Sequence, residues 1–175
     1  MKNLYQLCLA LLIASFLLTG CFEEVAGPYD GPDQIAFGQV GGLYQIEVND
    51  DVGSITLPTQ LIGPQRSTDF EVSVSVLEER ALRIREVQQG DGTTAPDTTV
   101  LAGSTTAPAG AYSVPEAYVF PADFSNVPFS ITINDDIIAD GDRQLLSVRL
   151  DGNEDVDIRP AENWRYFQIF INGVE

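Results

Sequence analysis

The chain has 175 residues, with 26 Asp and Glu against nine Lys and Arg, so its formal net charge is −17. It has no His, and Lys2 is its only Lys, which excludes Ser-His-Asp catalysis, His-ligated metals and Schiff-base or P-loop lysines. The acidic balance argues against nucleic acid as a partner, because phosphates need clustered Lys and Arg.

The N-terminal segment has the pattern of an export signal. Lys2 precedes an uncharged, mostly apolar run, Leu4–Leu18, which is short for a membrane span of about 20 residues and typical of a signal-peptide core. The run ends in the letters LLTGC at Leu17–Cys21, which resemble the bacterial lipobox. The resemblance implies that residues 1–20 are a lipoprotein signal peptide and that Cys21 is lipidated and anchors the chain in a membrane. A plain signal peptide or an uncleaved anchor is the alternative.

The residues after the cysteine indicate a destination. Glu23 and Glu24 follow Phe22, and acidic residues here resemble the export signal of Gram-negative groups that display lipoproteins on the outer face. We therefore expect an outer-membrane protein that faces the cell surface, with the periplasmic face as the alternative. Residues 21–33 contain Gly and Pro among acidic residues and predict a lipidated flexible tether. Residues 34–175 are predicted to form one domain.

Beyond residue 34 the apolar residues mostly alternate with polar ones, as in half-buried strands. The clearest segments are 70–76, 129–133 and 146–150, and segments 43–48 and 167–171 alternate less strictly. Shorter candidates lie at 35–37, 54–57, 112–114 and 118–120. Turn residues separate these segments, so the sequence predicts an all-β antiparallel sandwich or barrel.

Two consecutive segments are harder to interpret. Residues 77–89 are rich in helix formers and end before Gly90, which is typical of a helix C-terminus. The alternative is the return strand of a hairpin, which would bury Leu82 and Ile84, and we favour it because the rest of the domain is β. Residues 91–110, rich in Thr, Ala, Pro and Gly, are predicted to form a long surface loop.

Acidic residues cluster in the turn between strands 129–133 and 144–150. Asp135, Asp136, Asp140 and Asp142 lie within eight positions. They would bind Ca²⁺, which takes six to eight oxygen ligands, or they would form a solvated turn. We favour the solvated turn, because clustering of this kind is expected in so acidic a chain. The acidic segments 49–51 and 151–157 are interpreted in the same way.

The same region resembles the Calx-beta family. The resemblance is carried by 130–136, 140–142 and 145–150, with weaker likeness at 109–112, 119–122 and 164–173. It implies an Ig-like β-sandwich and, in calcium-binding members, ligands at Asp135 and Asp136. The chain departs from the family at Arg143, where an acidic residue is usual, and at Leu145, where Phe is usual. Arg143 could pair with Asp140 or Asp142 in place of the cation.

These features together predict a non-catalytic binding or structural role. Two alternatives are a carbohydrate-capture accessory protein of a nutrient-uptake system and a calcium-stabilised adhesion module. The partners would be the membrane, through the lipid, and a protein or glycan ligand, whose binding residues the sequence does not identify. The aromatic residues Trp164, Tyr166, Phe167 and Phe170 are expected in the core rather than in a sugar-stacking platform.

Overall fold

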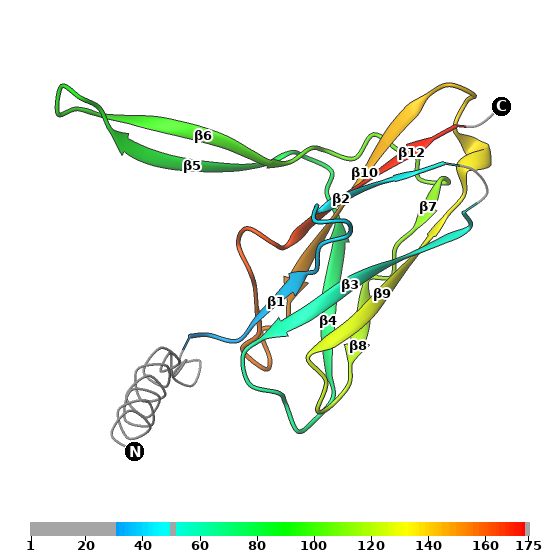
Figure 1. The fold of residues 1–175 in the computed structure, drawn as a ribbon, viewed down its shortest axis with the longest axis horizontal. Coiled ribbons are helices and arrows are strands. Elements are labelled where there is room, and N and C mark those ends of the chain that lie inside the picture. Colours follow the sequence, from blue (N-terminus) through cyan, green and yellow to red (C-terminus); the bar gives the residue numbers. More distant parts are fainter. Residues whose placement is uncertain (1–30, 50–51, 174–175) are drawn as a thin grey trace, which may run out of the picture. The chain divides into compact units, whose positions relative to one another are not determined.

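The computed structural model describes residues 31–49 and 52–173. These residues form two five-stranded sheets and one two-stranded hairpin, together with a 3₁₀ helix, η2 (Asp135–Ile137) (Figure 1). The strands in chain order are β1 (Gln34–Phe37), β2 (Gln45–Val48), β3 (Ser54–Ile62), β4 (Phe70–Val76), β5 (Ala81–Gln88), β6 (Thr94–Ala102), β7 (Tyr112–Ser113), β8 (Ala117–Phe120), β9 (Asn126–Ile133), β10 (Arg143–Gly152), β11 (Arg159–Pro160) and β12 (Tyr166–Asn172).

The two large sheets pack face to face as a β-sandwich, which confirms the predicted fold class. The first sheet has the order β11-β1-β3-β9-β7, and the second has the order β2-β12-β10-β4-β8. Most neighbours are antiparallel, but β1 pairs with β11 and β2 pairs with β12 in parallel. Because β1 and β2 belong to different sheets, the N-terminal part of the domain crosses from one sheet to the other.

Alternation along the strands sends one side chain in two into the space between the sheets. On β3 and β9 the buried and exposed positions alternate almost without exception. Phe37 of the first sheet packs edge-on against Phe167 of the second, with ring centroids 5.6 Å apart. Phe70 and Phe120 stack at 5.0 Å. The largest fully buried side chains are Phe37, Phe120, Phe129, Phe167, Ile35, Leu57, Ile131, Leu146, Leu150, Ile158, Ile169 and Ile171.

The hairpin of β5 and β6 lies outside both sheets, and we call residues 80–102 the arm (Figure 1). Its two strands pair only with each other among the described residues. The strand interpretation of residues 77–89 is therefore confirmed for 81–88. The expected burial is wrong, because the side chains of Leu82 and Ile84 are 44% and 65% exposed. The predicted loop at 91–110 is also wrong in part, since β6 occupies 94–102.

The base of the arm is fixed to the sandwich by a small apolar cluster. Leu77, Ala102 and Tyr166 are buried together, and Ala81 and Leu101 pack against them. Cys21, the predicted signal peptide and most of the predicted tether lie outside the described residues. Within the described part of the chain, no helix has the length and hydropathy that crossing a bilayer requires.

Candidate ligand-binding site at the base of the arm

Three side chains form a row across the outer face of the second sheet. Arg149 on β10 is directly opposite Ser75 on β4 and Tyr166 on β12. These positions alternate with core residues of the same strands, such as Val74, Val148 and Phe167, so the three side chains point away from the core. The strand register therefore places a hydroxyl, a guanidinium and a phenol next to one another.

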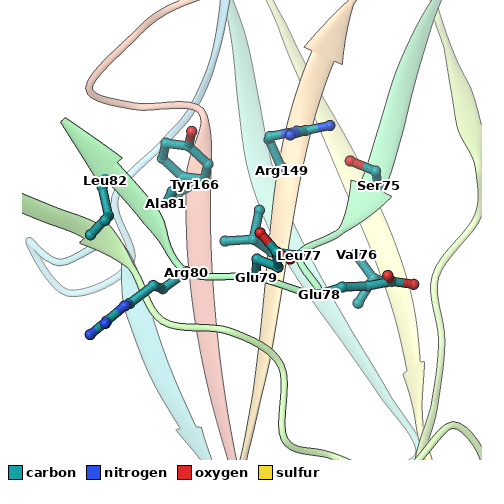
Figure 2. Close-up of a pocket in the computed structure, with 10 residues that line it drawn as sticks. All are labelled: Ser75, Val76, Leu77, Glu78, Glu79, Arg80, Ala81, Leu82, Arg149 and Tyr166. Carbon is teal, nitrogen blue, oxygen red and sulfur yellow. The ribbon is translucent and has the colours of Figure 1, made fainter. Parts of the chain in front are cut away.

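The chain leaving β4 builds a wall beside this row. The backbone N–H of Leu77 donates to the carbonyl of Ser147 at 2.9 Å, and residues 78–80 then turn away into the arm. The result is a hollow of about 400 Å³, which we call the arm-base hollow (Figure 2). The polar residues that line it are Ser75, Glu78, Glu79, Arg80, Arg149 and Tyr166.

The chain that leaves the arm covers the neighbouring part of the same face. The N–H of Thr106 donates to the carbonyl of Leu145 at 2.7 Å, and the N–H of Ser147 donates to Thr105 Oγ1 at 3.1 Å. This cover explains why Ser147 is fully buried although it points outward from β10. The outer face is thus closed beside the hollow and open at the row of Ser75, Arg149 and Tyr166.

Arg149 is held in place by one side of its guanidinium. Its Nε donates to Asp151 Oδ1 at 2.6 Å, and the side chain is about one-third exposed. Its two terminal nitrogens make no hydrogen bond with the described residues. Ser75 Oγ is buried and also lacks a hydrogen-bond partner there. Because unpaired buried polar atoms are uncommon, this hydroxyl marks a place where water or a ligand would be bound.

The charges around the hollow balance, although the chain as a whole is strongly acidic. Glu78 and Glu79 are opposed by Arg80 and Arg149. A second hollow, of about 540 Å³, shares Glu78, Glu79 and Arg80 and is completed by Leu82 and Ser104. Residues 78–80 therefore offer hydrogen-bond donors and acceptors to both hollows.

Tyr166 supports the hollow rather than offering an open ring. The guanidinium carbon of Arg165 lies 4.9 Å from the ring centroid of Tyr166, and Arg165 Nη2 donates to the hydroxyl of Tyr166 at 2.6 Å. The ring is buried beneath the base of the arm. Stacking of a sugar ring on Tyr166 is therefore blocked. Phe167 lies in the core as expected. The predicted core positions of Trp164 and Phe170 are wrong, because Trp164 is 44% exposed and Phe170 is half-buried on the outer face.

The predicted acidic cluster lies elsewhere, at the turn between β9 and β10. Asp135 and Asp136 begin η2, while Asp140 and Asp142 flank Gly141 in the turn before β10. Among the described residues, no three acidic side chains converge in a way that could hold a metal ion. For these four residues the solvated turn stays the favoured interpretation, and calcium binding stays the alternative.

Arg143, next to this turn, has a different partner from the expected one. Its guanidinium forms an ion pair with Glu47 on β2, and it lies 3.9 Å above the ring of Phe170. The proposed pairing with Asp140 or Asp142 is therefore wrong, because the register of β10, β12 and β2 directs Arg143 along the outer face of the sheet.

No protein-family model and no curated protein matches the sequence. Among solved structures, the apo form of the Calx CBD1 domain is similar, with 13% identity, a TM-score of 0.45 and coverage of 81% of this chain and 97% of that domain. A protein of unknown function from Bacteroides ovatus has 16% identity and a TM-score of 0.49, with coverage of 78% of this chain and 43% of that protein.

A further Bacteroides ovatus protein, to which carbohydrate binding has been provisionally attributed, has 12% identity and a TM-score of 0.48. The match covers 81% of this chain and 37% of that protein, so this chain spans less than half the length of either Bacteroides protein. The Calx-beta family, which the sequence resembles, is thus also represented among the similar solved structures.

Proposed function

We propose that this chain is a non-catalytic, lipid-anchored outer-membrane protein that binds a hydroxyl-rich, uncharged ligand, a glycan, in the arm-base hollow. The observation that carries the proposal is the row of Ser75, Arg149 and Tyr166, with unpaired donors and a buried unpaired hydroxyl beside a charge-balanced rim.

The polar groups of the hollow suit the chemistry of a sugar. Each sugar hydroxyl both donates and accepts, and the hollow offers guanidinium donors from Arg80 and Arg149 with carboxylate acceptors from Glu78 and Glu79. Because these four charges cancel, the hollow has no net attraction for an anion or a cation. An uncharged polar ligand therefore fits better than a phosphate or an amine.

A non-catalytic role follows from the residues that the chain lacks. Without His, and with Lys2 as its only Lys, it has none of the usual bases for activating a Ser nucleophile. The hollow has two carboxylates, Glu78 and Glu79, but they are adjacent in sequence rather than on opposite sides of a cleft, as a glycosidase pair would be.

Glycan binding can be tested with two matched arginine variants of the full chain. Arg149→Gln removes one of the two guanidinium groups of the hollow, the one that pairs with Asp151. Arg159→Gln removes a guanidinium that also pairs with an Asp two residues away but is far more exposed. On an array of neutral and anionic oligosaccharides, we expect the wild type and Arg159→Gln to retain the same neutral glycans. Arg149→Gln should lose tenfold or more in affinity, since an unpaired buried polar partner costs about 1–3 kcal/mol.

The outcomes of that experiment separate the alternatives. Equal binding by Arg149→Gln and Arg159→Gln would place the ligand elsewhere on the protein. Preference for anionic sugars would contradict the argument from charge balance. Absence of binding to any glycan would remove this ligand class and leave a protein ligand as the alternative.

The anchor is tested separately at Cys21. Mass spectrometry of the mature N-terminal peptide should find Cys21 acylated, and Cys21→Ser should release the protein from the membrane fraction. Protease treatment of intact cells should digest a surface-facing protein and spare a periplasmic one. An unmodified Cys21 in a membrane-bound mature chain would overturn the anchoring part of the proposal.

A further inference from the structure

The second hollow lies directly beside the arm-base hollow. The two share four lining residues, Glu78, Glu79, Arg80 and Leu82, and the second hollow adds Ser104 from the chain that leaves the arm. Their volumes are about 400 and 540 Å³. Both values are in the lower half of the range of about 300–1,000 Å³ for sites that hold one drug-sized molecule. Each hollow alone therefore suits a ligand of one or two sugar rings.

The segment that the two hollows share carries charged side chains without a partner in the described chain. Glu78, Glu79 and Arg80 are exposed, and none of them forms an ion pair or a hydrogen bond with another described residue. Figure 2 shows Glu78 and Arg80 pointing away from each other. The carboxylate acceptors and guanidinium donors of this shared wall are therefore free to meet a ligand in either hollow.

Leu82 gives both hollows an apolar contact. Its side chain is 44% exposed and belongs to the lining of both. A sugar ring has hydroxyl groups around its edge and C–H groups on its faces, so a site for it combines a few placed polar groups with apolar surface. Because both hollows provide this combination, they suit successive rings of one chain.

The two hollows are open to solvent rather than enclosed. A site that recognises the end of a chain needs a wall that stops the chain there. An open site instead lets the chain continue beyond the rings that are bound. The shape therefore favours recognition of internal units of a chain over recognition of its end.

We propose that the ligand of the arm-base hollow is a linear, uncharged oligosaccharide that extends past residues 78–80 into the second hollow and is bound through internal units. This inference rests on the glycan-binding role proposed above and adds the second hollow to it as a further subsite. Ser75 and Arg149 line only the arm-base hollow, whereas Ser104 lines only the second. The contribution of the second hollow should therefore appear only with chains long enough to reach it.

A length series of oligosaccharides tests the proposal. The probes are linear homo-oligosaccharides of glucose, mannose, galactose and xylose, from the monosaccharide to eight units, and the polymer of each. The full chain is purified in a detergent without a sugar headgroup, because such a headgroup would compete for the site. Affinities are measured by isothermal titration calorimetry for the wild type and for variants whose circular dichroism matches it.

Two tyrosine variants form a matched pair. Ser104→Tyr places a ring in the second hollow, and Ser67→Tyr places the same ring at an exposed loop serine outside both hollows. Arg149→Gln is the third variant and alters only the arm-base hollow. The three variants thus separate the effects of the two hollows from the effect of an added ring.

We expect the wild type to bind chains of about four units, enough for two rings in each hollow, at least tenfold more tightly than chains of two units. The polymer should bring no further gain for each bound segment. Ser104→Tyr should abolish the gain and leave the affinity for two-unit chains unchanged, whereas Ser67→Tyr should change neither. Arg149→Gln should weaken binding at every length.

Two results would overturn this inference and leave the glycan-binding role standing. The first is an Arg149-dependent affinity that does not rise with chain length. The second is a loss in Ser104→Tyr that is equal for short and long chains, or no loss at all. Binding of none of these oligosaccharides by the wild type would overturn the glycan-binding role and this inference together.

Discussion

The sandwich and the arm are built from strands with similar sequence patterns, yet they bury their side chains very differently. Phe70–Val76 alternates apolar and polar residues, and its apolar residues lie in the core. Ala81–Gln88 has apolar residues at positions 82 and 84 in the same alternation, and both are exposed. The difference is that two sheets face each other in the sandwich, whereas the described chain supplies no second layer for the arm.

This comparison assigns separate tasks to the two regions. The sandwich supplies the stability of a domain that contains no cysteine, and its second sheet holds the row that includes Arg149. The arm contributes a wall to the hollow and exposed side chains such as Ile84. Substitutions in the core of the sandwich should therefore lower stability, whereas substitutions of exposed residues in the hollow or on the arm should affect stability much less.

The largest expected effect is the loss of stability on removing a large side chain from the core. Phe167 is fully buried against Phe37, so Phe167→Ala should lower the free energy of unfolding by about 3–5 kcal/mol. Ile84→Ala in the arm should lower it by less than about 0.5 kcal/mol. Urea unfolding followed by circular dichroism measures both values. Similar losses for the two variants would mean that the arm is part of the cooperative core.

A second contrast uses two glycines with nearly the same positive φ. Gly152 (φ 80°) lies in the sandwich, where a Cβ would come within 2.3 Å of the carbonyl oxygen of Ile158. Gly92 (φ 84°) lies at the tip of the arm, where a Cβ would meet nothing within 4 Å. Gly152→Ala should cost about 2–4 kcal/mol, and Gly92→Ala about 1 kcal/mol from backbone strain alone.

Thermal melting of these two variants checks that order. Gly152→Ala combines the strain of a positive φ with a clash between the new Cβ and the carbonyl oxygen of Ile158. A backbone atom cannot move aside as the end of a flexible side chain can. A Gly92→Ala variant that melts lower than Gly152→Ala would show that the arm tip is more constrained than its open surroundings indicate.

Tyr118 links the two sheets by a buried hydrogen bond. Its hydroxyl, on β8 of the second sheet, donates to Thr59 Oγ1 on β3 of the first at 2.8 Å, and Thr59 donates to the carbonyl of Val127 at 2.7 Å. Burial raises the pKa of Tyr118 far above its usual value of 10, and the hydrogen bond with Thr59 opposes this only in part. The folded protein therefore keeps the phenol proton at a pH where the unfolded chain has lost it.

This shift has a defined consequence for stability. The contribution of Tyr118 is complete below about pH 10 and declines as the pH rises from there towards its folded pKa. Tyr118→Phe should cost about 1 kcal/mol at pH 7 and should make the decline above pH 10 less steep. Denaturant unfolding at pH 7 and pH 11 measures both effects. Tyr44→Phe, whose hydroxyl has no hydrogen bond in the described chain, is the control and should cost less at pH 7.

Most of the sandwich could be predicted from the sequence, because burial on one face leaves a period of two. This signal identified 70–76, 129–133 and 146–150, and turn residues separated them. Residues 91–110 were predicted as a loop because Thr, Ala and Pro lack that signal. β6 forms there because β5 offers it a full ladder of backbone hydrogen bonds, and a strand exposed on both faces needs no apolar alternation.

The candidate site could not be predicted, because its three residues are far apart in the chain. Ser75, Arg149 and Tyr166 meet only through the pairing of β4 with β10 and of β10 with β12. In the sequence, Ser75 and Arg149 look like ordinary solvent-facing residues of their strands, and Tyr166 is expected in the core. The acidic cluster of Asp135, Asp136, Asp140 and Asp142 was a candidate metal site because its members are close in sequence. Among the described residues, however, no three acidic side chains lie close enough together to hold a metal ion.

The smallest expected effect concerns that cluster. At η2 the N–H of Ile138 donates to the carbonyl of Asp135 at 2.8 Å, and the N–H of Gly173 donates to the carbonyl of Asp142 at 2.9 Å. The turn is therefore closed by its own backbone and does not need a cation to hold its shape.

Addition of millimolar Ca²⁺ should raise the melting temperature by less than about 1 °C, because Ca²⁺ stabilises the folded state only to the extent that it binds that state. Asp135→Asn/Asp136→Asn should show the same small response. A rise of several degrees that this double variant abolishes would instead make the turn a calcium site, and stability would then depend on one end of the sandwich as well as on its core.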